Sequence, residues 1–280
     1  YENNDLTSMY GRQENRMQET LDITRSQKPQ SLNQEFKLYF TLADDHIFSF
    51  EAQHLDQEEN PFSRAIRDRN PFTRLIPFSS SVNKYDVTQE RLVHTAKLEA
   101  KLDYYYLLND TSNINLSLGV TDVGQDFDSS FFQILDNGSL LNFNDPTFNN
   151  DVNFDFSDAY IALNYRLRTG IFTIDPGLTL HYYKTKNTQL GTSFERNISD
   201  VRPNLRINLQ FKKSESLRLT YRKNTQFTDI NNLAEGFVFS NYNSIFQGNR
   251  ELEAAVVNNY NLNYRSINQF TFTNIFANAN

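Results

Sequence analysis

The most constraining feature of this sequence is an unbroken alternation of apolar and polar residues. Between Val201 and Phe211 the chain reads VRPNLRINLQF, in which every apolar residue is followed by Arg, Asn or Gln. Successive side chains of a β-strand point to opposite faces, so this segment predicts a strand with one apolar and one polar face. Such a strand requires an apolar environment on one side and a polar environment on the other.

The same alternation recurs along the chain and predicts about ten strands. They are expected at 36–42, 46–55, 90–108, 113–121, 156–167, 171–184, 201–212, 217–224, 257–266 and 270–278. The connections between them alternate in length. The short ones are rich in turn-forming or polar residues, as hairpins require, and lie at 43–45, 109–112, 168–170, 213–216 and 267–269. The long ones are 56–89, 122–155, 185–200 and 225–256.

Tight turns at one rim and long loops at the other are typical of an antiparallel transmembrane β-barrel of the outer membrane. The sequence therefore predicts an all-β fold with residues 36–280 as the barrel portion, in contact with outer-membrane lipid. Residues 1–35 are polar and show no clear period, which predicts an extracellular loop segment. The chain begins at Tyr1 without a signal peptide and ends within a predicted strand, so we expect part of a larger barrel.

Composition excludes several other classes of protein. Mean hydropathy is −0.63, and no run approaches the roughly 18 apolar residues of a membrane helix. The 24 Phe and 15 Tyr fit strands and interfacial aromatic belts, and Tyr104, Tyr105 and Tyr106 predict part of such a belt. A net charge of −7 argues against a nucleic-acid partner. The absence of Cys excludes disulfides, zinc–thiolate sites and thiol catalysis.

No catalytic residue, metal or cofactor is predicted. The four His residues are spread over three predicted strands without a metal-ligand spacing, and there is no G-x-S-x-G, H-E-x-x-H or phosphate-binding loop. The acids of 122–128 and 151–158 lack the register of a calcium loop. Asp126 and Asp128 could form a hydrolytic pair at the rim of a barrel, but simple solvation is the favoured interpretation of loop acids.

Two segments near the C-terminus carry a resemblance to a known family. They read LRLTYRKNTQFTDINNL (217–233) and QGNRELEAAVVNNYNLNY (247–264). The first resembles a strand ending Y-R-x-N, and the second a G-N-P-x-L-x-P-E turn followed by a Y-x-L-x-Y strand. The matching residues are Tyr221, Arg222, Asn224, Gly248, Asn249, Leu252 and Glu253, whereas Arg250, Ala254 and Ala255 depart from the pattern. The chain thus resembles TonB-dependent receptors of the Bacteroidota, as do its segments 45–62 and 127–138.

The resemblance implies an active importer of a nutrient too large for porins. It implies a barrel of about 22 strands with a plug in its lumen, energised by a TonB contact made through the plug. Neither the plug nor that contact is in this sequence. A surface lipoprotein is a further partner that such a receptor can take. The alternatives are a self-contained small barrel acting as a pore or hydrolase, and a surface β protein used for adhesion.

Two sets of residues are candidates for contacts in such a barrel. Six arginines share the polar faces of their strands and are expected to face the lumen, because a charge facing lipid at the midplane costs roughly 2–4 kcal/mol. They are Arg166, Arg202, Arg206, Arg218, Arg222 and Arg265. They either contact the plug or an anionic substrate, or pair with lumen acids and water. Aromatic residues of the long loops either contact a ligand or pack the loops together; they are Phe131, Phe132, Phe237, Phe239 and Tyr242.

Overall fold

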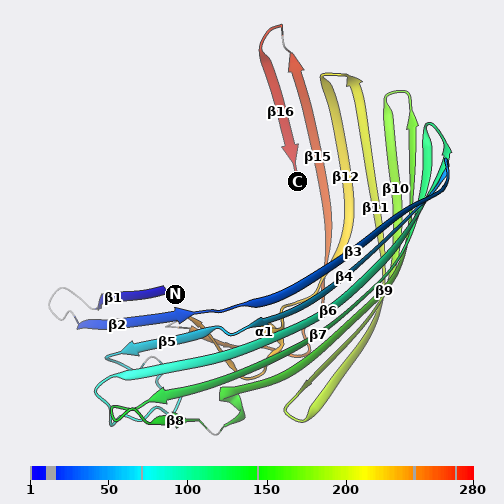
Figure 1. The fold of residues 1–280 in the computed structure, drawn as a ribbon. Helices are drawn as coiled ribbons and strands as arrows, with labels where there is room; N and C mark the ends of the chain where they lie inside the picture. The colour runs from blue at the N-terminus through cyan, green and yellow to red at the C-terminus, as the bar shows by residue number, and fades with distance from the viewer. Residues whose placement is uncertain (1, 11–16, 71, 144, 242–243, 269) are drawn as a thin grey trace.

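The computed structural model of the protein describes residues 2–10, 17–70, 72–143, 145–241, 244–268 and 270–280. Within these residues, fourteen strands form one antiparallel sheet and two more form a separate hairpin. The sheet is strongly curved, and the short turns at 44–45, 110–111, 170–171 and 213–214 lie toward one end, whereas the two-residue turn at 190–191 lies at the other (Figure 1). Among the described residues, no helix combines the length and apolar character needed to cross a membrane.

The sheet is built almost entirely from sequential hairpins. Its strands are β1 (Glu2–Tyr10), β2 (Met17–Ser26), β3 (Gln30–Ala43), β4 (His46–Glu59), β5 (Phe62–Arg67), β6 (Tyr85–Asn109), β7 (Ser112–Ile134), β8 (Leu140–Asn142), β9 (Asn149–Thr169), β10 (Phe172–Gln189), β11 (Thr192–Lys212), β12 (Glu215–Gln226), β15 (Ala255–Asn268) and β16 (Thr273–Ala279). The order is β1-β2-β5-β6-β7-β9-β10-β11-β12-β15-β16, with β3 on β4 and β4 on β6. The long β6 pairs with β4 near the short turns and with β5 farther out.

Each of the ten predicted strands is present in the predicted order, but the described residues form six further strands, and several of the ten are much longer than expected. β6 has 25 residues and β7 has 23, whereas a tilted membrane strand needs about 9–11. Much of the predicted loops 56–89, 122–155 and 185–200 therefore consists of strand extensions. The structure has strands both before and after position 35. The division of the chain into an extracellular loop segment, 1–35, and a barrel portion, 36–280, stays a prediction.

Irregular points of the sequence have local explanations in the structure. Pro176 interrupts the β9–β10 ladder, which pairs Ile174 with Leu167 and resumes at Gly177 with Asn164. The β11–β12 ladder ends at Asn204, directly after Pro203. Each proline thus lacks a ladder partner on one side, as expected for a residue without a backbone donor, although both are aligned with a residue of the neighbouring strand in the β10–β11 ladder.

The predicted strand 270–278 begins too early. Phe272 has a φ of 51° and lies in the turn before β16, which starts at Thr273. The alternation of β16 is therefore counted from Thr273, and Asn274 lies on the polar face instead of breaking the apolar one.

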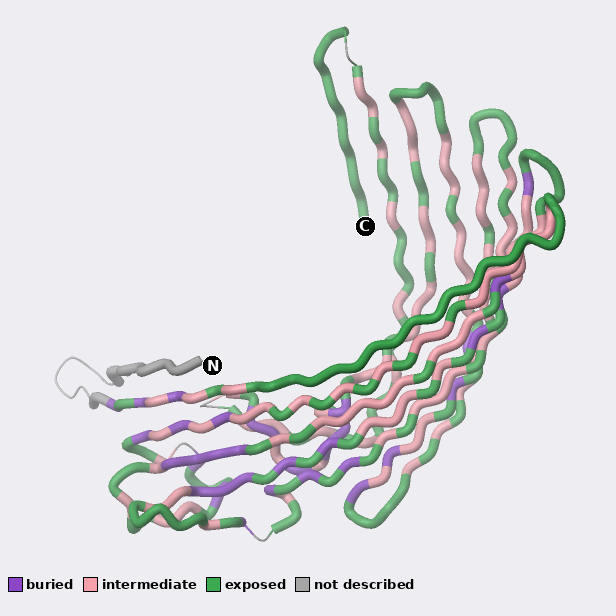
Figure 2. The backbone as a smooth tube through the Cα atoms, viewed as in Figure 1, coloured by how far each residue is buried: buried purple, intermediate pink, exposed green. Residues whose placement is uncertain are grey.

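The sheet has two faces, which the ladder register defines across the strands. The outer face carries Leu118 of β7, Leu163 of β9 and Leu178 of β10, and the inner face carries Asn115, Asn164 and Asn204. The most buried residues gather at the end of the sheet away from the short turns (Figure 2). There the segment 227–254 packs on the inner face, with α1 (Ile230–Leu233), β13 (Phe237–Asn241) and β14 (Ser244–Gln247).

Candidate functional site

A row of amide side chains lies on the inner face, at the level where the outer face is apolar. Register aligns Asn115, Asn164, Gly177 and Asn204 on four neighbouring strands. Asn164 Nδ2 donates to Asn115 Oδ1 at 3.4 Å, and Asn204 Nδ2 donates to Asn164 Oδ1 at 3.4 Å. The second bond crosses β10 over Gly177, where an added Cβ would overlap both Asn side chains. The glycine is therefore needed for the two amides to meet across an intervening strand.

A second glycine admits an aromatic ring in the same way. The Tyr160 ring lies over Gly119 of β7, which leaves no room for a Cβ at that position. On the far side of Gly119, Lys101 Nζ pairs with Asp103 at 2.7 Å, and the Ser117 hydroxyl donates to the same carboxylate. The inner face is thus a bonded polar layer, and its side chains reach over neighbouring strands instead of projecting independently.

Three of the six predicted arginines meet in one groove beside this row. Arg166 Nε donates to Asp175 at 2.7 Å, and an Arg206 nitrogen lies 3.9 Å from the same carboxylate. Arg222 lines the same groove, a cavity of about 470 Å³ that also includes Tyr221. Among the described residues that line the groove, Asp175 is the one acid, whereas the three arginines and Lys101 are cations. The groove is therefore cationic. The Arg166 and Arg206 side chains are about half exposed, which leaves donors free for another group.

The other three arginines lie elsewhere on the inner face. Arg202 pairs with Asp200 at 2.9 Å and lies 5.2 Å from the centre of the Tyr183 ring. Arg218 and Arg265 lie nearer the short turns, opposite Asn208 and Ser216 respectively. The common face predicted for all six arginines therefore agrees with the register, whereas their contacts with a plug or substrate stay a prediction.

The histidines have separate partners. His181 Nδ1 lies 3.0 Å from Asp158 on the inner face, and its ring stacks on Tyr183. His46 lies 2.7 Å from the Tyr104 hydroxyl, and His94 lies 3.2 Å from Asp56. In the part of the chain that the structure describes, no group of three or more His, Asp or Glu side chains could hold a metal ion.

Two of the three tyrosines predicted to form an aromatic belt share the outer face, and their place at the membrane interface stays a prediction. Tyr104 and Tyr106 flank His46 on the outer face, and their rings stack on it at 5.9 and 4.9 Å between centroids. Tyr105 has the opposite orientation and lines the cationic groove. This follows from the alternation of a strand, which cannot place three successive residues on one face.

Beyond the groove, the segment 227–254 is held by buried amide side chains. Gln89 of β6 donates to the Phe237 carbonyl at 2.9 Å and accepts from the Phe239 amide at 2.8 Å. Asn150 of β9 accepts from the Gly236 amide at 2.8 Å. Gln189 Nε2 of β10 donates to the Leu233 carbonyl at 2.9 Å, and its side-chain oxygen accepts from the Glu235 amide at 3.0 Å. We call these three residues, Gln89, Asn150 and Gln189, the amide clamp.

An ion pair adds to the amide clamp. Arg250 pairs with Glu235 within the segment and donates to the Thr192 hydroxyl at 2.6 Å. The hydrogen bond to Glu235 raises the pKa of the Arg250 guanidinium, although partial burial opposes this. Sequence reasoning missed both the clamp and this pair, because the segment was expected to be an external loop and the clamp residues were not singled out.

Most of the loop aromatic residues that were candidates for ligand contact lie inside the core between the segment 227–254 and the sheet. Phe131 and Phe239 are 1% and 6% exposed, and their ring centroids lie 5.7 Å apart. Phe132 is buried and Phe237 is partly buried, whereas Tyr242 lies outside the described residues. Their burial fits the packing interpretation that the sequence left open, and direct contact with a ligand stays a prediction.

Long antiparallel strands with a continuous apolar face and a bonded polar face define an outer-membrane β-barrel protein. Residues 41–280 match the family model described as the outer membrane protein beta-barrel family, and the chain belongs to that family. It accordingly lies in the cell outer membrane. No curated protein matches the chain.

Solved structures of outer-membrane receptors and transporters share a broad likeness with the chain. The ferric preacinetobactin receptor BauA from Acinetobacter baumannii matches with 12% identity and a TM-score of 0.49, over 89% of this chain and 35% of that one. The copper transporter OprC matches with 9% identity and a TM-score of 0.47, over 90% and 46%. The ferric citrate transporter FecA matches with 11% identity and a TM-score of 0.43, over 89% and 44%. The chain spans less than half the length of each.

Proposed function

We propose that this chain forms part of the barrel wall of an outer-membrane transporter of the TonB-dependent type, which imports a nutrient too large for porins. The observation that carries the proposal is the cationic groove around Asp175 on the inner face. In a plugged transporter, Arg166, Arg206 and Arg222 would bind carboxylates of the plug or of an anionic substrate through paired hydrogen bonds.

The edges of the sheet also favour a wide barrel. Among the described residues, β3 pairs only with β4 and β16 only with β15. Unpaired backbone groups are unfavourable in lipid, so further strands are expected to complete the wall. In this proposal the segment 227–254, fixed by the amide clamp, forms a constriction that an incoming nutrient passes before it reaches the cationic groove.

The proposal is tested by access to the groove in living cells. In the full-length protein, Thr220→Cys places a thiol in the groove, and an impermeant maleimide is added from outside. Labelling should be slow without TonB and faster when TonB is present and the inner membrane is energised, because the plug then moves. Ser193→Cys, on an exposed outer-face position, is the matched control and should label equally in both conditions.

The same assay separates the remaining alternatives. A self-contained pore would leave Thr220→Cys accessible at the same rate with and without TonB, and that result would contradict the proposal. Rapid labelling that is unchanged by loss of the energy source would have the same meaning.

A further inference from the structure

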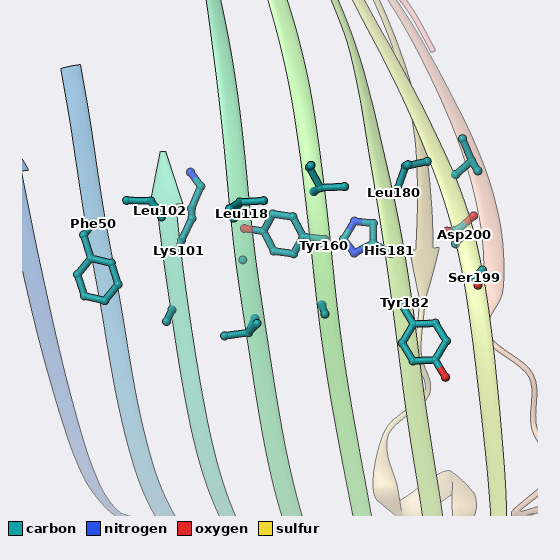
Figure 3. Close-up of a pocket in the computed structure, with 16 residues that line it drawn as sticks. Phe50, Lys101, Leu102, Leu118, Tyr160, Leu180, His181, Tyr182, Ser199 and Asp200 are labelled. Carbon is teal, nitrogen blue, oxygen red and sulfur yellow. The ribbon is translucent and has the colours of Figure 1, made fainter. Parts of the chain in front are cut away.

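The outer face is hollowed at one depth across several strands. One row of large residues runs across it, formed by Phe50, Leu102, Leu118, Ile161, Leu180 and Val201. The next row toward the long strand extensions is mostly small, formed by Ala52, Ala100, Val120, Ala159, Tyr182 and Ser199. Short side chains beside long ones leave a cavity of about 730 Å³ (Figure 3). We call this cavity the outer groove.

The outer groove lies at the border between the apolar and polar parts of the outer face. One row farther from the short turns, the outward residues become Asp122, Ser157, Lys184 and Asn197. Tyr182 lies at this border and is 53% exposed, as expected for an aromatic residue at the headgroup level. Short turns of such barrels face the periplasm, so the outer groove lies in the external leaflet.

The side chain of Lys184 lies beside the outer groove. Lys184 is exposed, two residues after Tyr182, and forms no ion pair within 4 Å among the described residues. The next outward lysine, Lys186, is 3.8 Å from Glu195. Two acids of the next row, Asp155 and Glu195, lie opposite Lys186, and Asp122 in the row of Lys184 accepts the Ser157 hydroxyl at 2.6 Å. Lys184 is therefore available to an anion at the depth of lipid headgroups.

We propose that the outer groove binds an anionic lipid of the external leaflet that bears a phosphate monoester. One acyl chain lies against Ala100 and Ala159, where the short side chains let it approach the backbone, and its phosphate pairs with Lys184. The occupant is a lipid because this face is in contact with the membrane, and it is anionic because the free group at the rim is a lysine. This inference does not depend on the transport function.

The test measures lipid retention by the full-length protein. The protein is placed in nanodiscs of phosphatidylcholine doped with monophosphorylated lipid A or with its dephosphorylated form, and retained lipid is counted by native mass spectrometry. The phosphorylated form should be retained preferentially. Ala159→Phe, which fills the outer groove, and Lys184→Gln, which removes the charge, should each reduce retention about tenfold. Lys186→Gln is the matched control and should have no effect.

Each outcome decides the proposal. Equal retention of the two lipids, or retention that Ala159→Phe leaves unchanged, overturns it. A signal that responds to Lys186→Gln as strongly as to Lys184→Gln also overturns it, because the attraction would then be unspecific. Folding of each variant is checked by its heat-dependent gel shift, and Ala159→Leu replaces Ala159→Phe if the larger side chain prevents folding.

Discussion

Removing one member of the amide clamp should release the segment 227–254 from the inner face. The Gln89 side chain is fully buried and bonds both the carbonyl of Phe237 and the amide of Phe239. Gln89→Leu keeps the approximate volume but leaves both backbone groups without a partner. A buried unsatisfied polar group costs about 1–3 kcal/mol, so the two together cost about 2–6 kcal/mol of local stability.

This loss is measurable by hydrogen exchange. Opening of β13 that becomes about 2 kcal/mol easier accelerates amide exchange roughly 30-fold. The assay is exchange followed by mass spectrometry on peptides covering 227–254 of the folded full-length protein in micelles. Gln125→Leu is the control, because Gln125 is bonded to Thr95 at 3.1 Å and has no described bond to the segment. Unchanged exchange around Phe237 in Gln89→Leu, or equal acceleration in Gln125→Leu, would refute the reasoning.

Three further predictions concern the two faces and the strand extensions. Leu118→Arg places a charge on the outer face and should lower the folding yield in lipid by an amount corresponding to about 2–4 kcal/mol. Thr121→Arg, on the inner face beside Glu99, should fold normally. Equal folding yields of the two variants would contradict the assignment of the faces. Gly177→Ala should destabilise the barrel by about 1–3 kcal/mol in urea titrations, because its Cβ overlaps the Asn row, whereas Gly124→Ala has room and should not. Burial and then the neighbouring acid Asp151 raise the pKa of Asp128, so ionisation is unfavourable in the folded state. Stability should therefore fall as pH rises from the ordinary Asp range through the raised pKa, and Asp128→Asn should remove that dependence in urea titrations at a series of pH values.

The faces of the strands could be predicted because alternation reports directly on which side meets lipid. The segment around Val201 carries this information in every residue, and the same rule located the ten predicted strands, although the last one was started three residues too early. The strand extensions could not be predicted in the same way. Beyond the lipid the outer face turns polar, as at Asp122 and Asp126, so both faces carry polar residues and the alternation fades.

The site was only partly predictable for a related reason. The alternation within each strand was enough to place the six arginines on one face, but which of them meet depends on Asp175 and on the open space above Gly177. The contact of Gln89 with Phe237 joins residues 148 positions apart, and no local pattern reports such a contact. Phe270 and Phe272 resembled the apolar face of a strand, although the positive φ of Phe272 places them in a turn.

The central claim is that the face bearing Leu118 meets lipid and the face bearing Asn115 meets the interior of the barrel. The most direct test is a spin-label scan along β7, with single cysteines from Ile114 to Thr121 in a chain that has no Cys of its own. Collisions with oxygen, which partitions into lipid, should be high at even positions and low at odd positions. A polar nickel chelate should show no access at the even positions. Uniform oxygen access along the strand, or the reverse alternation, would contradict the account.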